Sequence, residues 1–153
     1  MNSLELKVPP PIVALLFAVA MWAASRFAPV LAIDSRLRFA IAAAFWLSGF
    51  VVSVLGFLAF RRAKTTVNPV QPDKASSIVS AGIYGFTRNP MYVGLTCLLL
   101  GWTVYLAVPW TLLGPIVFVL YMTRFQIQPE ERVLTAKFGR EYGDYKDRVR
   151  RWV

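Results

Sequence analysis

The side chains that could do chemistry in this sequence gather in two polar stretches, residues 61–88 and residues 124–153. The first stretch is followed by Asn89-Pro90, which has the composition of a helix start. The N-terminus of a helix offers free N–H groups and partial positive charge to a carboxylate or phosphate. The second stretch contains Glu130 and Glu131, and carboxylates suit a cationic or hydroxyl-rich ligand or the transfer of a proton. Together the two stretches could bind a small cofactor and its substrate.

Each stretch also has a purely structural interpretation. Asn89 and Pro90 can be no more than an N-cap and an N1 proline, with Arg88 as an anchor for a lipid headgroup. In the tail, apolar residues recur every three to four positions, which predicts an amphipathic helix on a membrane surface. The residues of that apolar face are Val133, Leu134, Phe138, Tyr142 and Tyr145. Local chemistry alone leaves both interpretations open.

The composition excludes several classes of protein. Of the 153 residues, 57% are hydrophobic and only 16% are charged, whereas about a quarter of an average soluble domain is charged. The chain has no histidine, which excludes a Ser-His-Asp triad and an HExxH metal site. Cys97 is the only cysteine, so an internal disulfide, a zinc knuckle and an iron–sulfur cluster are excluded as well. We therefore expect a small, basic integral membrane protein with one domain, residues 1–153, and no metal site.

Membrane-spanning helices are the elements that must position the two polar stretches. A spanning helix needs about 20 mostly apolar residues, and two segments before residue 61 meet that length. The uncharged block at 89–123 would be about 52 Å long as one helix, well beyond a bilayer core of about 30 Å. A break at Ala107-Val-Pro-Trp110 divides it into a helical hairpin. The sequence thus predicts an all-α, polytopic membrane protein with four transmembrane helices and a cytoplasmic C-terminal helix. The predicted spans are 12–33, 39–60, 91–107 and 110–123.

The distribution of lysine and arginine predicts the orientation of the chain. With a cytoplasmic N-terminus, the inner segments hold 14 of the 17 cations, and only Arg26, Arg36 and Arg38 lie outside. Both polar stretches, 61–90 and 124–153, then face the cytoplasm, and we expect a multi-pass protein of a bacterial inner membrane. The formal net charge of +9 is explained by basic segments beside anionic lipid. The lipid bilayer is therefore the expected partner, and no nucleic acid is expected.

Five short motifs occur in order along the second half of the chain. They are Thr65-Thr-Val-Asn-Pro69, Val79-Ser-Ala-Gly-Ile-Tyr84, Arg88-Asn-Pro-Met-Tyr-Val-Gly94, Glu130-Glu131 and Phe138-Gly-Arg-Glu-Tyr142 with Tyr145. Each motif is weak alone, but the ordered set is fairly specific. The set resembles the isoprenylcysteine carboxyl methyltransferase family and the related membrane phospholipid N-methyltransferases. The similarity covers about residues 55–153.

The resemblance implies an S-adenosyl-L-methionine-dependent methyltransferase without a Rossmann domain, and the chain contains no GxGxxG motif. In such enzymes the cofactor lies in a cytoplasmic pocket built by the loop, the start of the next helix and the tail. A lipophilic methyl acceptor enters from the bilayer. Carried over by position, Glu130 and Arg124 are the expected catalytic residues. The expected cofactor-binding residues are Ser76, Ser77, Ile78, Val79, Gly82, Tyr84, Arg88, Asn89, Pro90, Met91, Tyr92 and Glu131.

This chain departs from the resembled pattern at two positions. Asn89 stands where the prenylcysteine enzymes usually have histidine, and an amide forms hydrogen bonds but cannot titrate. Gln126 corresponds to a tail arginine that the resemblance assigns to the carboxylate of the prenylcysteine. Arg124 could replace that arginine only if the helix is bent or shifted there. The identity of the acceptor, the atom that is methylated and the oligomeric state therefore stay open.

Two other functions stay open on the sequence. Some membrane sterol or enone reductases share this C-terminal architecture, and their NADPH carries a 2′-phosphate that would suit the clustered cations Arg148, Arg150 and Arg151. A non-catalytic four-helix membrane scaffold could use the same basic face to hold a partner or anionic lipid. A proton-coupled exporter is disfavoured, because the predicted spans contain no Asp, Glu or Lys.

Overall fold

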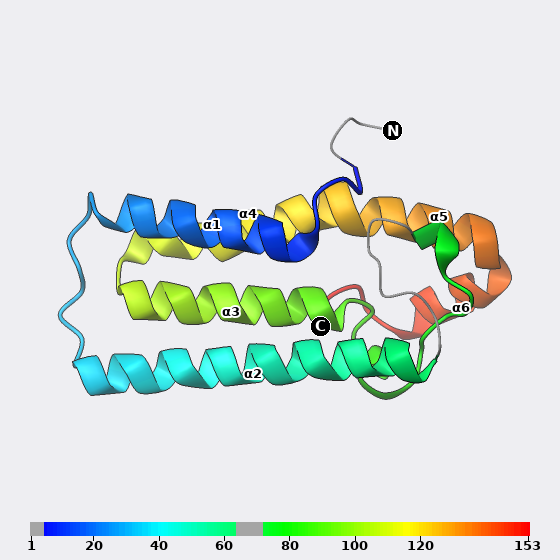
Figure 1. The fold of residues 1–153 in the computed structure, drawn as a ribbon, viewed down its shortest axis with the longest axis horizontal. Helices are drawn as coiled ribbons and strands as arrows, with labels where there is room; N and C mark the ends of the chain where they lie inside the picture. The colour runs from blue at the N-terminus through cyan, green and yellow to red at the C-terminus, as the bar shows by residue number, and fades with distance from the viewer. Residues whose placement is uncertain (1–4, 64–71) are drawn as a thin grey trace.

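Every regular element is helical in the part of the chain that the structure, a computed structural model, describes, residues 5–63 and 72–153. Four helices run along the long axis of the molecule, and two more extend beyond one end (Figure 1). Their bounds are α1 Pro10–Ser25, α2 Ser35–Arg62, α3 Pro90–Leu106, α4 Leu113–Met122, α5 Gln128–Phe138 and α6 Arg140–Arg148. Short 3₁₀ turns lie at Pro72–Lys74, Gly82–Gly85 and Pro109–Leu112. The predicted all-α class is confirmed for these residues, while the motif Thr65-Thr-Val-Asn-Pro69 lies outside them.

The first two helices differ from their predicted bounds for local reasons. Helix α1 begins at Pro10, with proline in its first turn, and ends at Ser25. The predicted segment 12–33 is not helical beyond that point, because Pro29 disfavours the α conformation in the residue before it. Helix α2 begins four residues before the predicted position 39, because the carboxylate of Asp34 accepts hydrogen bonds from the first free N–H groups of the helix.

Glycines bring α2 and α3 into close contact. A methyl group on Gly49 would lie 2.6 Å from the carbonyl oxygen of Gly94, and one on Gly101 would lie 2.5 Å from Trp46 Cδ1. Only glycine allows the two backbones to approach this closely. Near the end of α2, Gly56 packs against Met91 at the start of α3 in the same way. This packing fixes the height of the first turn of α3, which carries several of the predicted site residues.

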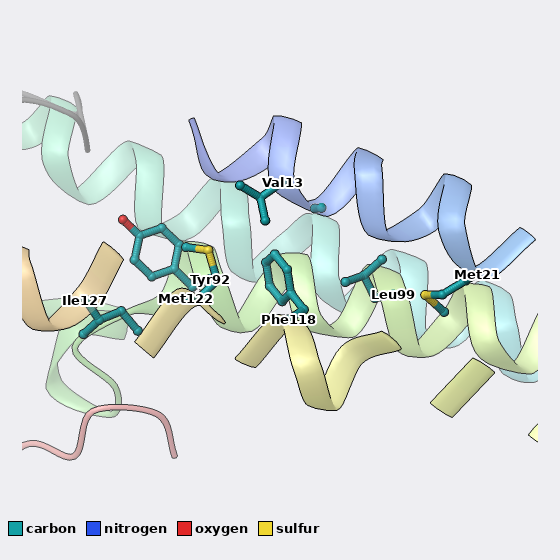
Figure 2. Packing of buried hydrophobic residues seen from close by; sticks show 8 residues of the cluster. Val13, Met21, Tyr92, Leu99, Phe118, Met122 and Ile127 are labelled. Atoms are coloured by element: carbon teal, nitrogen blue, oxygen red, sulfur yellow. The ribbon is translucent and has the colours of Figure 1, made fainter. Parts of the chain in front are cut away.

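A buried cluster joins α1, α3 and α4. Phe118 and Met122 of α4 are fully buried, and Phe17 of α1 meets Phe118 edge to face at a centroid distance of 5.8 Å. Figure 2 shows Val13, Met21, Tyr92, Leu99, Phe118, Met122 and Ile127 of this cluster. Tyr92 and Ile127 lie toward one end of the row in this view. The hydrophobic core therefore extends to the end of the bundle at which the polar residues gather.

Two helical runs are long and apolar enough to cross a membrane, judged by length and composition. They are Ser35–Arg62 and Pro109–Phe138, while the other apolar helices, Pro10–Ser25 and Pro90–Leu106, are shorter. A 30-residue run such as Pro109–Phe138 is about 45 Å long, so only part of it fits a bilayer core of about 30 Å. Its charged residues begin at Arg124. The uncharged part of the run, residues 109–123, is the part whose composition suits a bilayer core.

The tail contains two irregularities that the amphipathic pattern does not predict. The turn at Thr123–Ile127 between α4 and α5 is π-helical, and Gly139, with φ of +53°, separates α5 from α6. Because of the second break, α6 folds back against the loop before α3 (Figure 1). Near the C-terminus, the indole N–H of Trp152 donates to Thr123 Oγ1 at 3.1 Å. The end of the chain is thus attached to the helical bundle.

Candidate functional site

A pocket lies where the loop before α3, the first turn of α3 and the tail helices α5 and α6 meet. It holds about 820 Å³ of empty space when its open mouth is included. Ten of the predicted site residues line it. They are Ser77, Ile78, Val79, Tyr84, Arg88, Asn89, Met91, Tyr92, Glu130 and Glu131. The structure therefore brings the loop and the tail to one pocket.

Four predicted residues are not among those that line the pocket. Ser76 is exposed, and Gly82, with φ of +62°, begins the short turn that presents Tyr84. Pro90, the first residue of α3, is fully buried. Arg124 is directed elsewhere, because its guanidinium forms an ion pair of 3.0 Å with the buried carboxylate of Glu5.

An ion-pair network holds the loop against the tail. Arg88 Nη2 lies 2.9 Å from Glu131 Oε1, and Arg151 Nη2 lies 2.7 Å from Glu131 Oε2. Arg88 also donates to the carbonyl oxygen of Lys146 at 3.2 Å through Nη1. Only 10% of its side chain is exposed, so Arg88 is a structural and pocket residue here and does not extend toward a lipid headgroup. Its Nε–H is buried and has no hydrogen-bond partner among the residues that the structure describes.

Asn89 attaches the C-terminal segment to the start of α3. Its side-chain amide donates to the carbonyl oxygen of Arg151 at 2.8 Å. The backbone N–H of Arg88 donates to the carbonyl oxygen of Arg150 at 3.0 Å. The side chain of Asn89 forms no cap bond to α3, although the residue holds the N-cap position. The predicted helix start is present. The side-chain amide of Asn89 also joins two segments that lie about 60 residues apart in the sequence.

Glu130 is the carboxyl group at the apolar end of the pocket. Its Oε1 accepts a hydrogen bond from Tyr92 Oη at 2.8 Å and another from Gln126 Nε2 at 3.0 Å. Among the described residues, Glu130 forms no ion pair. Burial raises its pKa to about 7, although the hydrogen bonds from Gln126 and Tyr92 favour the ionised form. A carboxyl group with such a pKa can take up and release a proton near neutral pH.

Aromatic side chains form much of the wall of the pocket. Tyr145 Oη donates to the carbonyl oxygen of Tyr84 at 2.8 Å, and Phe60 meets the ring of Tyr84 edge to face at 5.3 Å between centroids. Tyr142 lies beside Tyr145, with 6.1 Å between ring centroids. Burial raises the pKa of Tyr145 to about 12, so its phenol stays neutral at physiological pH. Neutral aromatic faces are suited to stacking with a heterocycle and to contact with a cation.

Sequence reasoning missed several residues of this site. Tyr142 and Tyr145 were assigned to an apolar helix face, and only the break at Gly139 turns that face into the pocket. Gln126 is almost fully buried beside Glu130, and the sequence identified it only as a departure from a pattern. Arg151 was assigned to lipid phosphates, but it pairs with Glu131. No spacing in the sequence indicates that last contact, because it depends on how the C-terminal segment crosses the start of α3.

The chain is similar in sequence to several known proteins. A model of the phospholipid methyltransferase family matches residues 37–141. The chain is similar to the protein-S-isoprenylcysteine O-methyltransferase of Mus musculus, with 34% identity over 116 residues, 68% of this chain and 40% of the relative. A probable protein-S-isoprenylcysteine O-methyltransferase of Oryza sativa subsp. indica is 31% identical over 104 residues, 66% of this chain and 53% of the relative.

The chain is also similar to a shorter protein. An uncharacterized protein of Haemophilus influenzae is 48% identical over 63 residues, which is 41% of this chain and 100% of that protein. The chain spans only about half, or less, of the two isoprenylcysteine relatives. No solved structure matches the chain significantly.

Proposed function

Because the chain belongs to the phospholipid methyltransferase family, we propose that it is an S-adenosyl-L-methionine-dependent methyltransferase acting on a lipophilic small molecule, a prenylated compound or a lipid at the membrane. The single observation that carries this proposal is the shared pocket. Tyr84 from the loop and Glu130 from the tail line one cavity, although 46 positions separate them in the sequence. A cofactor in this cavity would contact both polar stretches at once.

The residues present fit this cofactor. Within the described part of the chain the buried Nε–H of Arg88 has no partner, and it lies on a side chain that lines the pocket, so it is suited to a carboxylate such as that of the methionine moiety. The wall of Tyr84, Tyr142 and Tyr145 is suited to the adenine ring and to a sulfonium cation. When bound, the cofactor supplies a methyl group activated on a positively charged sulfur.

The chain's own residues would align the methyl donor with the acceptor and exclude water from the pocket. Orientation of two reactants can contribute up to roughly 7–11 kcal/mol in favourable cases. Met91, Ile127 and Leu134 give the pocket apolar walls that keep water out. Glu130 would take the proton that the acceptor loses. Tyr92 and Gln126 act as positioning residues, since both hold the same oxygen of that carboxyl group.

We further propose that the bundle crosses the membrane four times, along α1, α2, α3 and the uncharged part of the run that contains α4, with residues 61–90 and 124–153 in the cytoplasm. Large side chains on the outside of the bundle support this topology. Leu15, Leu47 and Leu120 are 63%, 65% and 64% exposed, which a protein in water would avoid over so wide a surface. The loop and the tail meet at the same end of the bundle, as the positive-inside rule requires (Figure 1).

The experiment that tests the proposed function is transfer of a labelled methyl group. Membranes containing the protein are incubated with S-adenosylmethionine labelled in its methyl group and with a total lipid and quinone extract. We expect label in one lipophilic product, which mass spectrometry then identifies. Absence of any labelled product, with protein that is folded and binds S-adenosylhomocysteine, would contradict the proposal.

A further inference from the structure

The segment that precedes α1 is bound to the tail. The carboxylate of Glu5 accepts one hydrogen bond from Arg124 at 3.0 Å and another from Arg132 at 2.7 Å. Only 3% of the Glu5 side chain is exposed. Arg124 lies in the π-helical turn Thr123–Ile127, and Arg132 lies in α5. One buried carboxylate therefore links the π-helical turn to the helix that follows it.

A backbone hydrogen bond joins the same two parts of the chain. Pro129 has no N–H, so it cannot donate to the carbonyl oxygen of Phe125 four residues before it. The backbone N–H of Leu6 donates to that carbonyl oxygen at 3.1 Å. Leu6 has a φ of +57°, which is uncommon for a residue other than glycine and is kept only where the surrounding contacts hold it. The segment thus meets the tail at a carbonyl group that loses its usual helical partner to proline.

The segment is also fixed to the hydrophobic core. Val8 packs against the buried cluster of α1, α3 and α4, and Pro10, the first residue of α1, is fully buried. Figure 1 shows the segment, in dark blue, passing beside the helical run between α4 and α5 before α1 begins. The contacts of Glu5 and Leu6 therefore tie the tail to the core of the bundle at the level of the π-helical turn.

The π-helical turn carries the amide that contacts Glu130. Gln126 follows directly after Arg124 and Phe125, two residues of the turn that the segment binds. Its Nε2 donates to Glu130 Oε1 at 3.0 Å, and only 3% of Gln126 is exposed. The angle per residue in a π-helical turn differs from that in an α-helix. Conversion of this turn to an α-helix would therefore rotate Gln126 relative to Glu130.

We propose that Glu5 is a positioning residue for methyl transfer: by holding the π-helical turn in place, it keeps the amide of Gln126 on the carboxyl group of Glu130. The inference rests on the proposed function, in which Glu130 takes up a proton. Glu5 is not among the residues that line the pocket. Its effect on the reaction therefore passes through the turn and not through contact with the methyl donor or the acceptor.

The direction of the expected change separates positioning from simple electrostatics. Burial raises the pKa of Glu130 to about 7, and the hydrogen bond from Gln126 opposes this rise, so loss of that bond should raise the pKa further. Removal of the negative charge of Glu5 would by itself lower the pKa of Glu130, because a carboxyl group ionises more easily when a like charge is taken away. In the described part of the chain, none of the other titratable side chains that line the pocket pairs with Glu5. They are Tyr84, Arg88, Tyr92, Glu131, Tyr142 and Tyr145.

The test measures the pKa of Glu130 in the variant Glu5→Gln, which keeps the size of the side chain but removes the charge that the two arginines bind. The carboxyl group of Glu130 is titrated by infrared spectroscopy in the purified protein, and its band is identified by its absence in Glu130→Gln. We expect the pKa to rise by roughly one pH unit, the value of one hydrogen bond to a charged group. The rise of kcat/KM should move to higher pH by the same amount, with the affinity for S-adenosylhomocysteine unchanged. An unchanged or lowered pKa would overturn the inference.

Two comparisons separate positioning from a general loss of stability. Asp34→Ala removes the carboxylate that caps α2 at the opposite end of the bundle, so it should lower the unfolding temperature and leave the pKa of Glu130 unchanged. In a Gln126→Met background the amide is absent, so Glu5→Gln should not raise this pKa any further. The same shift in Asp34→Ala, or an equal further rise in the Gln126→Met background, would overturn the inference.

A second variant covers the case in which Glu5→Gln does not fold. Glu5→Asp keeps the charge but withdraws the carboxylate from the two arginines by the length of one methylene group. It should raise the pKa of Glu130 by a smaller amount, and the absence of any rise would overturn the inference. The infrared titration needs neither methyl donor nor acceptor. Wild-type protein that shows no methyl transfer would therefore refute the proposed function, while the titration would still decide whether Glu5 positions the carboxyl group.

Discussion

The phenol of Tyr92 in the first turn of α3 donates a 2.8 Å hydrogen bond to Glu130 in the first turn of α5. This bond joins the start of α3 to the tail at the pocket, and Tyr92 belongs to both the pocket lining and the hydrophobic core. Gln126 donates to the same oxygen of Glu130. The carboxyl group is therefore held in one orientation by two neutral donors from different helices, as a group that handles a proton requires.

The pH dependence of methyl transfer should follow Glu130. With a pKa of about 7, the carboxyl group is mostly protonated and unable to accept a proton below neutral pH, so kcat/KM for an acceptor that must lose a proton should rise through pH 7. The hydrogen bond from Tyr92 favours the ionised form. Tyr92→Phe should therefore raise this pKa and move the rise to higher pH. The measurement is the pH profile of kcat/KM for both proteins, and a shift to lower pH in the variant would contradict the assignment.

Replacement of Glu131 by alanine should loosen the loop from the tail. The carboxylate is mostly buried and pairs with two arginines, so its removal leaves two cations without a counter-charge. Loss of one partner from a buried pair costs roughly 3–5 kcal/mol. We expect a lower thermal unfolding temperature and at least tenfold weaker S-adenosylhomocysteine binding. Glu141→Ala, on the exposed face of α6, serves as the control and should change neither.

Removal of the Tyr84 ring should weaken cofactor binding without unfolding the protein. The ring lines the pocket and packs against Phe60, but its contacts are confined to this end of the bundle. Tyr84→Ala should reduce the affinity for S-adenosylhomocysteine at least tenfold in a fluorescence titration. Tyr105→Ala removes an exposed ring near the other end of α3 and should leave the affinity unchanged. Equal affinities in all three proteins would return Tyr84 to a purely structural role.

The close contact of α2 and α3 should not tolerate a side chain at Gly94. A methyl group there would overlap Ser53 Oγ and lie 2.6 Å from the carbonyl oxygen of Gly49, so the helices would have to separate. Overpacking of this kind typically costs 1–3 kcal/mol. Gly94→Ala should therefore lower the unfolding temperature, whereas Gly143→Ala, with open space around it, should not. A variant Gly94→Ala as stable as the wild type would show that the contact can relax.

Much of the fold follows from simple sequence patterns. The apolar runs correctly indicate the helices, and the break at Ala107-Val-Pro-Trp110 is where α3 ends and the next turn begins. The pairing of the loop with the tail follows from the ordered motifs. Helix ends are predicted less well, because they depend on single residues such as Asp34 and Pro29 acting on the backbone.

The side-chain directions in the tail could not be predicted from sequence. In a regular α-helix, the directions of the Arg124 and Gln126 side chains around the helix axis would follow from their spacing. The π-helical turn Thr123–Ile127 changes the angle per residue and therefore these directions. The structure turns Gln126 toward Glu130 and Arg124 toward Glu5. The second partner is 119 positions away in the sequence, and no local pattern indicates it. Whether Arg124 has a catalytic role therefore stays a prediction, and its ion pair with Glu5 does not favour one.

The central claim is that one pocket between the loop and the tail binds the methyl donor. Calorimetric titration of the purified protein with S-adenosylhomocysteine tests it most directly, with NADPH as the comparison that separates a methyltransferase from a reductase. We predict saturable binding of one S-adenosylhomocysteine per chain, weakened at least tenfold in Glu131→Ala, and no saturable heat with NADPH. Folded protein that binds NADPH and not S-adenosylhomocysteine, or that binds neither, would contradict the account.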